Sequence, residues 1–402
     1  MLVRPEARKR RVLIIVENLP CPFDRRVWQE ARTLTSAGYL VSIICPKGRG
    51  HDKSFEQLDG IAIYRHSLPV EASGALGYAL EYSWALIAEF YLSLKILFLR
   101  GFDVVHACNP PDTIFILGRM YKLFGKKFLF DHHDVNPELY EAKFNRRDFF
   151  YRMMLAFERW TFAAADISIA TNESYKKVAI ERGKMPAENV FVVRSGPDLR
   201  RVKAVPANAT LKKGRQYLVG YVGVMGSQEG VDLLLSAVRY IVYTCNRQDI
   251  QFGLVGGGTE LQAMRELAQH LGVADYVTFT GRVPDEILLE MLSTADVCVN
   301  PDVANAMNDM STMNKIMEYM ALGKPIVQFD LTEGRVSAQE ASLYAKRNDP
   351  EDLARKILDL LADEPMRERM GRFGRDRVAN VLSWEYEAPR LLAAYETLFQ
   401  NA

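Results

Sequence analysis

The chain has 402 residues, of which 51 are Lys or Arg and 50 are Asp or Glu, so its formal net charge is +1. This length exceeds the ~250–300 residues at which single hydrophobic cores stop growing, which predicts two domains. A near-neutral charge argues against a nucleic-acid-binding protein, which normally carries a basic surplus. It does not exclude a small anionic ligand, because a phosphate site needs only a few local donors.

Short apolar segments alternate with helical segments along the first half of the chain. We expect strands at 11–16, 40–45, 61–64, 103–107, 127–131, 165–171 and 189–194, and helices at 25–37, 76–99 and 114–124. Continuous apolar strands separated by helices are typical of a parallel sheet covered on both faces. A polar connector at 197–216, where the apolar periodicity is lost, separates this half from the next.

The second half repeats the pattern. We expect strands at 217–223, 251–256, 276–281, 296–300 and 325–330. We expect one helix that begins at 231, another that ends at 271, two more at 285–294 and 311–322, and a helical tail from 349. The sequence therefore predicts an α/β fold with two doubly wound, Rossmann-like domains at 1–199 and 200–381. A last helix at 382–402 is expected to pack back on the first domain. Two such domains facing each other would form a deep cleft, with ligands at the carboxyl ends of the strands.

The cysteines are scattered and odd in number: Cys21, Cys45, Cys108, Cys245 and Cys298. No pair has the spacing of a metal site or a redox motif, which predicts buried free thiols in a reducing cytoplasm.

A long apolar stretch at 76–99 raises the question of a membrane helix. Glu81, Glu89 and Lys95 interrupt it, which disfavours a spanning helix. We expect a helix packed on the sheet. A helix lying at the bilayer interface, aided by the basic cluster 8–11, remains an alternative. The basic start of the chain is expected to be a flexible lead, because the apolar run behind it is too short for a signal peptide.

The most informative segment is NDMSTMNKIMEYMALGKPIVQFD at 308–330. On a helix that opens near Ser311, the side chains of Asn314, Lys315 and Glu318 share one face. Ser311 or Asp309 can cap this helix, whose free N–H groups form an anion site. A carboxylate such as Glu318 suits the two hydroxyls of a ribose. A capped surface helix with an ordinary Lys-to-Glu pair is the alternative interpretation.

This segment resembles the nucleotide-binding signature of the family 4 glycosyltransferases, which have the GT-B fold. Further segments resemble that family in the same order along nearly the whole chain: ENLPCPFDRRVWQEARTLTSAGYLVSIICP, FDVVHACNPPD, FDHHDVNPELYEAKF, ADISIATNES, RSGPDL, GYVGVMG, GLVGGGTELQAM and VTFTGRVPDE. The resemblance implies a retaining glycosyltransferase that uses a nucleotide sugar as substrate and needs neither a cofactor nor a metal.

The resemblance assigns roles on the donor side residue by residue. Glu318 would bind the ribose, and Arg282 and Val283 would flank the base. The loop Gly223–Gly226, which includes Val224, would approach the pyrophosphate through its backbone, as glycine allows.

The chain departs from the family pattern at several positions. Met310 stands where the family has the first of two acids, and Asp309 is the nearest acid and our catalytic candidate. Val224 and Glu229 replace the usual arginine and lysine. We expect Ser311, Thr312, Asn314, Lys315 and the start of their helix to stabilise the leaving diphosphate instead, with Arg25 or Arg26 as a weaker option.

The resemblance also assigns roles on the acceptor side. His133 would meet the donor sugar as a catalytic residue, with Asp134 orienting its ring. Asp134 can alternatively cap the helix that begins at Pro137. His132 is expected to point into the domain, and the His-His pair is a poor metal site because neighbours on an extended chain point to opposite sides.

Other polar residues follow strands of the first half. Asp24, Arg25 and Arg26 open a helix after the first strand, where the arginines suit a phosphate-bearing acceptor or form a solvated helix start. His106 and Asn109 would line the cleft or serve the core and a turn, and Glu138 is a further acceptor-side candidate.

These interpretations combine into one expected function. The chain would move a sugar from a nucleotide sugar to a glycan or lipid-linked acceptor in polysaccharide biosynthesis, with a UDP-sugar as the first candidate donor and a GDP-sugar as the second. We expect it in the cytoplasm, with peripheral contact at the inner face of the membrane as an option. A nucleotide-sugar epimerase, which needs acid–base groups for proton removal, and a non-catalytic nucleotide-sugar-binding protein are the alternatives.

Overall fold

The computed structural model describes residues 9–67 and 74–400 and divides the chain into two compact units. Unit 1 comprises Met1–Glu141, Asn145–Arg194 and Glu387–Ala402, and unit 2 comprises Ala142–Phe144 and Ser195–Tyr386. The chain thus passes into unit 2 within the RSGPDL segment and returns to unit 1 near its end. Most of the basic lead expected at the start of the chain, residues 1–8, lies outside the described residues.

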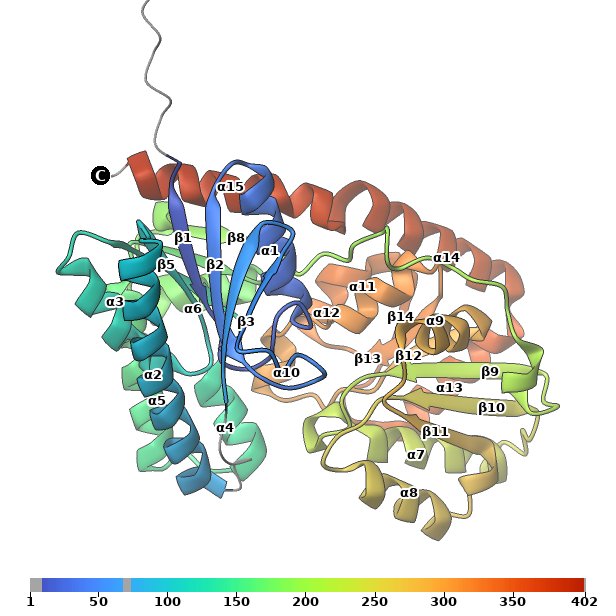
Figure 1. Cartoon of the computed structure of the whole chain (residues 1–402). Coiled ribbons are helices and arrows are strands. Elements are labelled where there is room, and N and C mark those ends of the chain that lie inside the picture. Colours follow the sequence, from blue (N-terminus) through green and yellow to red (C-terminus); the bar gives the residue numbers. More distant parts are fainter. Residues whose placement is uncertain (1–8, 68–73, 401–402) are drawn as a thin grey trace, which may run out of the picture. The chain divides into compact units, whose positions relative to one another are not determined.

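The described residues of unit 1 form one sheet with the strand order β3-β4-β2-β1-β5-β6-β7-β8 (Figure 1). All neighbouring strands are parallel except β3, which runs antiparallel to β4. The strands are β1 (Arg11–Ile15), β2 (Leu40–Pro46), β3 (Phe55–Leu58), β4 (Ile61–His66), β5 (Val104–Cys108), β6 (Lys127–His132), β7 (Ile167–Ala170) and β8 (Val190–Val192).

Helices cover both faces of this sheet, as the alternating pattern predicts. The helices are α1 (Arg25–Ser36), α2 (Gly74–Leu99), α3 (Phe115–Lys122), α4 (Asn136–Phe144), α5 (Phe149–Ala164), α6 (Glu173–Glu181) and, at the end of the chain, α15 (Trp384–Gln400). Figure 1 shows α2, α3 and α5 together on one side of the sheet, away from α1.

The described residues of unit 2 form a second, fully parallel sheet with the order β11-β10-β9-β12-β13-β14. Its strands are β9 (Tyr217–Val222), β10 (Ile250–Val255), β11 (Val277–Gly281), β12 (Val297–Asn300), β13 (Ile326–Phe329) and β14 (Ser342–Ala345). Its helices are α7 (Val231–Arg239), α8 (Leu261–His270), α9 (Asp285–Thr294), α10 (Ala306–Met310), α11 (Asn314–Ala321), α12 (Thr332–Ala338), α13 (Pro350–Ala362) and α14 (Glu364–Arg377).

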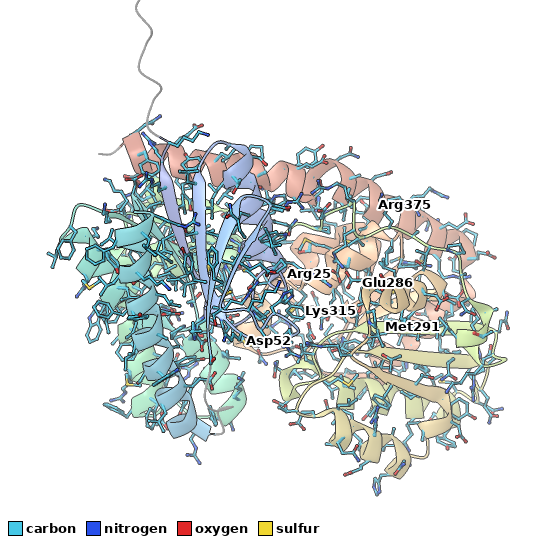
Figure 2. The ribbon with its side chains drawn as sticks, in the orientation of Figure 1. Arg25, Asp52, Glu286, Met291, Lys315 and Arg375 are labelled. Carbon is cyan, nitrogen blue, oxygen red and sulfur yellow. The ribbon has the colours of Figure 1, made fainter. Side chains whose placement is uncertain are left out.

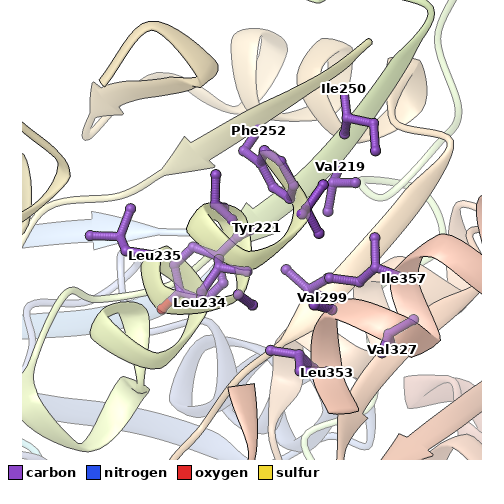
Figure 3. Close-up of a cluster of buried hydrophobic side chains, with 14 of the residues drawn as sticks. Val219, Tyr221, Leu234, Leu235, Ile250, Phe252, Val299, Val327, Leu353 and Ile357 are labelled. Atoms are coloured by element: carbon purple, nitrogen blue, oxygen red, sulfur yellow. The ribbon is translucent and has the colours of Figure 1, made fainter. Parts of the chain in front are cut away.

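Two apolar clusters pack on the two faces of the unit 2 sheet. One joins the strands to α7 and α13 through side chains such as Val219, Phe252 and Ile357 (Figure 3). The other joins the strands to α9 and α11 through side chains such as Leu292 and Met320. Because both faces are covered, the strands read as continuous apolar runs rather than alternating ones.

The strand ranges expected from the sequence agree closely with the observed strands, whereas β3 and β14 were not predicted. All five cysteines are free, as expected, and all but Cys245 are buried. In both sheets the order reverses beside the first strand of the unit, between β1 and β5 and between β9 and β12. Residues that follow these strands therefore occupy the position where doubly wound sheets bind ligands.

Candidate functional site

The start of α11 carries a buried cation in unit 2. Lys315 lies in the first turn of this helix (Figure 2), and its Nζ is 2.6 Å from Glu229 Oε2 and 2.7 Å from Asp302 Oδ1. The hydroxyl of Tyr221 donates to the same Glu229 oxygen at 3.2 Å. Tyr221 lies near the end of β9, Glu229 follows that strand, and Asp302 and Lys315 follow β12, so the topology brings these side chains to the expected ligand-binding edge of the sheet.

The charges in this cluster are strongly coupled. Burial by itself would lower the pKa of Lys315, but Asp302, Tyr221 and Glu229 together raise it well above its ordinary value. Burial raises the pKa of Asp302 to about 7, although Lys315 acts in the opposite direction. Lys315 is therefore cationic, while Asp302 exchanges its proton near neutral pH. The expected phosphate-binding lysine is already engaged by two carboxyl groups.

Glu318, the expected ribose-binding residue, lies one turn further along α11 and is held by an arginine. Arg201 places one guanidinium nitrogen 2.6 Å from Glu318 Oε1 and another 2.8 Å from Asp285 Oδ2. The side chain of Glu318 is 13% exposed, so most of it is shielded from solvent. Arg201 was not among the predicted site residues, because 117 positions separate it from Glu318 in the sequence.

Two glycine turns of unit 2 pack directly on each other. Gly223 N donates to Val255 O at 3.1 Å, and Met225 N donates to Gly257 O at 3.0 Å. A Cβ atom on Gly256 would lie 1.8 Å from the carbonyl oxygen of Gly223, so this position excludes every other residue. The close backbone contact fixes the loop that the family resemblance places beside the pyrophosphate.

The helix at 311–322 begins later than expected, and its expected caps are wrong. The segment Ala306–Met310 forms the separate helix α10, and Ser311 is its C-cap, with Oγ donating to Met307 O at 2.7 Å. Helix α11 starts at Asn314 after the N-cap residue Met313, which forms no side-chain cap hydrogen bond. The side chain of Asn305 caps α10, so a helical turn forms before the expected start.

Asp309, the expected catalytic acid, is bound into a structural contact. Its carboxylate accepts hydrogen bonds from the backbone N–H and the hydroxyl of Thr332, at 3.0 and 2.9 Å, and pairs with Arg347 at 2.7 Å. These bonds hold the first residue of α12, and they give Asp309 the role of a helix-capping carboxylate.

The remaining donor-side candidates differ in their exposure to solvent. Asn314 and Arg282 are exposed, and Thr312 is half-buried. Val283 is half-buried and packs on the apolar cluster beside α9 and α11. Val224, which stands at the family's arginine position, is 54% exposed and offers no charge to a ligand.

In unit 1 the polar side chains converge on Asp131, at the end of β6. Arg26 donates to Asp131 Oδ1 at 2.8 Å and to Oδ2 at 3.2 Å, and the ring Nε2 of His133 contacts Oδ2. Burial alone would raise the pKa of Asp131, but Arg26 and His133 hold it well below its ordinary value. The side chain of His133 is 16% exposed, so a small part of it reaches solvent. The carboxylate that contacts His133 is thus Asp131, where we expected Asp134.

Arg26 is a buried cation in the core of unit 1, so it is not part of a solvated helix start. It is 7% exposed, pairs with Glu30 at 3.1 Å and donates to Val193 O at 2.7 Å. The groups Glu30–Asp131–His133 and His106–Cys108–Asp131 have distances that suit a metal ion. Arg26 already supplies the positive charge among these carboxylates, so a metal ion would have to compete with it.

His106 lies in the core and joins this cluster to the last helix. Its Nδ1 is 2.8 Å from the hydroxyl of Tyr395 on α15, and its Nε2 lies 3.5 Å from Asp131. Burial lowers the pKa of His106, which keeps the ring neutral. Of the two readings for His106, the core role is therefore the one that the structure supports.

Asn109 serves a turn. Its Oδ1 accepts from the backbone N–H groups of His133 and Asp134, at 2.7 and 3.2 Å, and its Nδ2 donates to Asp134 O and Asp112. Asn109 thereby fixes the backbone that carries His133. Helix α4 begins at Asn136 with Val135 as its N-cap residue, so the expected cap position of Asp134 is off by one.

The other acceptor-side candidates have distinct environments. Asp24 caps α1 by accepting from Val27 N at 3.0 Å, and Arg25 is exposed on the first turn of that helix. Glu138 is buried and paired with Arg182, so it is not free for an acceptor. His132 is fully buried against aromatic rings, as expected, and burial lowers its pKa to about 3.

Comparison with known proteins agrees with this architecture. A model described as Glycosyltransferase Family 4 matches residues 24–201, and a model described as Glycosyl transferases group 1 matches residues 216–363. Among solved structures, sucrose-phosphate synthase from Thermosynechococcus elongatus superposes with a TM-score of 0.79 over 98% of this chain and 100% of that one, at 20% identity. HepE from Anabaena in complex with UDP-glucose superposes with a TM-score of 0.70 over 96% of this chain and 99% of that one, at 14% identity.

Curated relatives match a shorter part of the chain. A D-inositol 3-phosphate glycosyltransferase of Thermomonospora curvata is 27% identical over 59% of this chain and 58% of its own length. A 2-deoxystreptamine glucosyltransferase of Streptomyces kanamyceticus is 27% identical over 61% of this chain and 64% of its own length. The match thus spans less than two thirds of each relative.

Two doubly wound sheets, each with charged side chains gathered at the carboxyl ends of its strands, match the architecture of the GT-B fold. Both family models match in the order that the resemblance of the sequence segments implied. The chain belongs to the family 4 glycosyltransferases.

Proposed function

We propose that this glycosyltransferase moves a hexosyl or N-acetylhexosaminyl group from a nucleoside-diphosphate sugar to a glycan or lipid-linked sugar in polysaccharide biosynthesis. A UDP-sugar is the first candidate for the donor and a GDP-sugar the second. A relative supports the nucleotide class: a Mycobacterium tuberculosis protein, 27% identical over 54% of this chain, is a GDP-mannose-dependent mannosyltransferase. HepE was solved with UDP and with UDP-glucose.

The observation that carries the proposal is the arrangement of Lys315 and Glu318 on one face of α11. A carboxylate with the geometry to accept from a ribose diol lies one helical turn from a cation at the helix start. The helix dipole and the first free N–H groups of α11 add positive potential at the same end. A nucleoside diphosphate laid along this helix would meet both groups.

Lys315 must be released from its carboxyl partners to serve a diphosphate. The pKa of Asp302 is about 7, so an incoming negative charge favours its protonation near neutral pH. Protonation weakens the Lys315–Asp302 pair and lets the ammonium group turn toward the phosphate. UDP should therefore bind more tightly at pH 6 than at pH 8. Asp302→Asn should remove this pH dependence, apart from the part that comes from ionisation of the phosphate groups of UDP.

We propose a retaining reaction without an essential metal. A donor phosphate oxygen would take the proton of the acceptor hydroxyl. The acceptor oxygen would attack the anomeric carbon from the same face of the sugar that the diphosphate leaves. The chain would supply positioning and electrostatic stabilisation, through Lys315, Asn314, Thr312 and the start of α11 on the donor side. His133, held by Asp131, would orient a sugar hydroxyl.

The test is release of UDP or GDP from a panel of nucleotide sugars, with glycan and lipid-linked acceptors and with EDTA in a parallel series. The Glu318→Ala variant should lose most nucleotide affinity, while Glu340→Ala, an exposed carboxylate of the same unit, should match the parent protein. The absence of nucleotide release from every donor and acceptor pair would argue against the proposal. Activity that survives only without EDTA would refute metal independence.

A non-catalytic nucleotide-sugar-binding protein is the second candidate. The exposed Val224 and the carboxylate of Glu229 stand where the family has an arginine and a lysine, and Lys315 is shared between two acids. Tight binding of UDP or GDP that depends on Glu318, without any turnover, would favour this alternative.

A further inference from the structure

Helix α2 of unit 1 has an apolar stripe that faces away from the protein. Leu80, Trp84, Ile87, Tyr91 and Phe98 are 74, 48, 63, 67 and 84% exposed. Their spacing of three or four residues, interrupted only at Lys95, places them on one side of the helix. A row of large exposed apolar side chains on a folded protein marks a surface that contacts something other than water.

The opposite side of α2 anchors it to the unit 1 sheet. Ala85, Glu89, Ser93 and Ile96 are fully buried, and α2 packs on β2 and β4. Among the described helices, the segment Leu80–Leu99 alone has the length and hydropathy to cross a membrane, with 22% of it buried. A helix held to the sheet in this way presents its free side along its length, which suits a surface that lies against it.

Two further exposed apolar side chains stand at the end of α3, which is a neighbour of α2. The hydroxyl of Tyr121 on α3 donates to Ser93 Oγ on α2 at 2.7 Å, so the two helices are neighbours. Directly after α3, Leu123 and Phe124 are 86 and 67% exposed. Lys126 follows them and lines a hollow together with Phe98. We call the α2 stripe together with Leu123 and Phe124 the α2–α3 face.

The fully exposed charges around the α2–α3 face are basic, whereas Glu81 of α2 is half-buried and Lys122 pairs with Asp166. Among the described residues of α2 and α3, every exposed charged side chain is basic: Lys95, Arg119 and Lys122. Arg100 is also exposed, directly after α2. A second copy of the chain docked through the same face by twofold symmetry would bring like charges together. An anionic lipid surface complements both the apolar side chains and the basic ones.

We propose that the α2–α3 face docks on the surface of an anionic phospholipid bilayer. The apolar side chains of α2, with Leu123 and Phe124, would enter the boundary between headgroups and acyl chains, and Lys95, Arg100 and Arg119 would contact lipid phosphates. This docking deepens the proposed function, because it brings the enzyme to the membrane in which a lipid-linked acceptor resides. Vesicle binding does not require sugar transfer, so the two proposals can fail separately.

The test is co-sedimentation of the full-length protein with vesicles of phosphatidylcholine, with and without about 30% phosphatidylglycerol, at low and high salt. We expect binding to the anionic vesicles that weakens with salt. Ile87→Glu should reduce the partition coefficient about tenfold or more, because it places a charge in the apolar stripe. Ile287→Glu makes the same change at an exposed position of α9 and should leave binding unchanged.

A second pair of variants tests the electrostatic part. Lys95→Glu should weaken binding to anionic vesicles several-fold and leave the weak binding to neutral vesicles unchanged, whereas Lys203→Glu, an exposed lysine of unit 2, should have no effect. Circular dichroism and thermal unfolding would show that each variant is folded. Equal vesicle binding by Ile87→Glu and Ile287→Glu would overturn the proposal. So would a dimer in solution that Ile87→Glu dissociates, without any vesicle binding by the parent protein.

Discussion

Replacement of Lys315 by methionine isolates the energetic role of the buried cluster at the start of α11. Methionine keeps an unbranched side chain of similar size but removes the charge that Glu229 and Asp302 share. Asp302 is 1% exposed and Lys315 10%, so water cannot replace the ammonium group without a change in the structure. We therefore expect Lys315→Met to destabilise unit 2 at neutral pH.

The magnitude follows from the burial of the pair. Removal of one partner from a buried ion pair costs about 3–5 kcal/mol, and Asp302 can limit this cost by taking up a proton. Its pKa, already about 7 through burial, would rise further without Lys315. Where the folded state holds a proton that the unfolded state has released, stability falls by about 1.4 kcal/mol per pH unit as pH rises. In the parent protein the fall in stability levels off above about pH 7, because Asp302 of the folded state has then also released its proton. The cost of the substitution should thus grow by about 2 kcal/mol between pH 7 and pH 8.5.

Hydrogen exchange of peptides from β9 and α11 would measure this cost within unit 2, at pH 7.0 and 8.5. Urea unfolding followed by circular dichroism gives an independent value. Lys203→Met is the matched control, because Lys203 is exposed in the same unit. The double variant Lys315→Met/Asp302→Asn should recover part of the loss at high pH. A cost below about 1 kcal/mol, or one that does not change with pH, would refute the argument.

Three further substitutions probe other parts of the fold. Asp131→Asn should destabilise unit 1 by about 3 kcal/mol, because it removes the main buried partner of Arg26, and an unfolding assay measures this effect. The same substitution should lower sugar transfer, because Asp131 holds His133, and a nucleotide-release assay measures that effect. Glu89→Gln should stabilise the protein by an amount that grows with pH, because burial raises the pKa of Glu89 well above its usual range. The gain should be up to about 1.4 kcal/mol per pH unit above pH 4. Thermal unfolding at pH 5 and pH 8 tests the trend, and an equal effect at both pH values would contradict it. Gly256→Ala should cost about 3 kcal/mol and weaken UDP binding, because its Cβ would overlap the neighbouring turn; calorimetry with UDP would show whether binding survives.

The sequence was sufficient to predict the fold because burial on both faces leaves a local signal. Strands such as β2 and β10 are continuous apolar runs, and the polar connector marks the change of unit. The strand β3 was missed for the same reason: FEQL alternates between exposed and half-buried residues at the sheet edge, so no apolar run marks it.

The chemistry of the candidate site was less accessible from the sequence, because its partners are distant in the chain. The residues expected to matter do lie at strand ends, but Arg26 meets Asp131 from 105 positions away and Lys315 meets Glu229 from 86 positions away. Spacing along one helix shows which side chains share a face, but cannot show which opposite charges neutralise them. The start of α11 was also mistaken, because Asn305 caps the separate turn α10 and Ser311 ends that turn instead of opening the next helix.

The contact between His106 and Tyr395 has a consequence for biosynthesis. Unit 1 contains both the first strand of the chain and the segment from Glu387 onward. During translation its sheet can assemble early, but the last buried polar contact beside Asp131 waits until residue 395 has left the ribosome. In a nascent chain stalled after unit 2, the buried polar side chains beside Asp131 would therefore lack their cover by α15. A fragment that ends at Arg194 should fold less stably than the same unit in the whole protein.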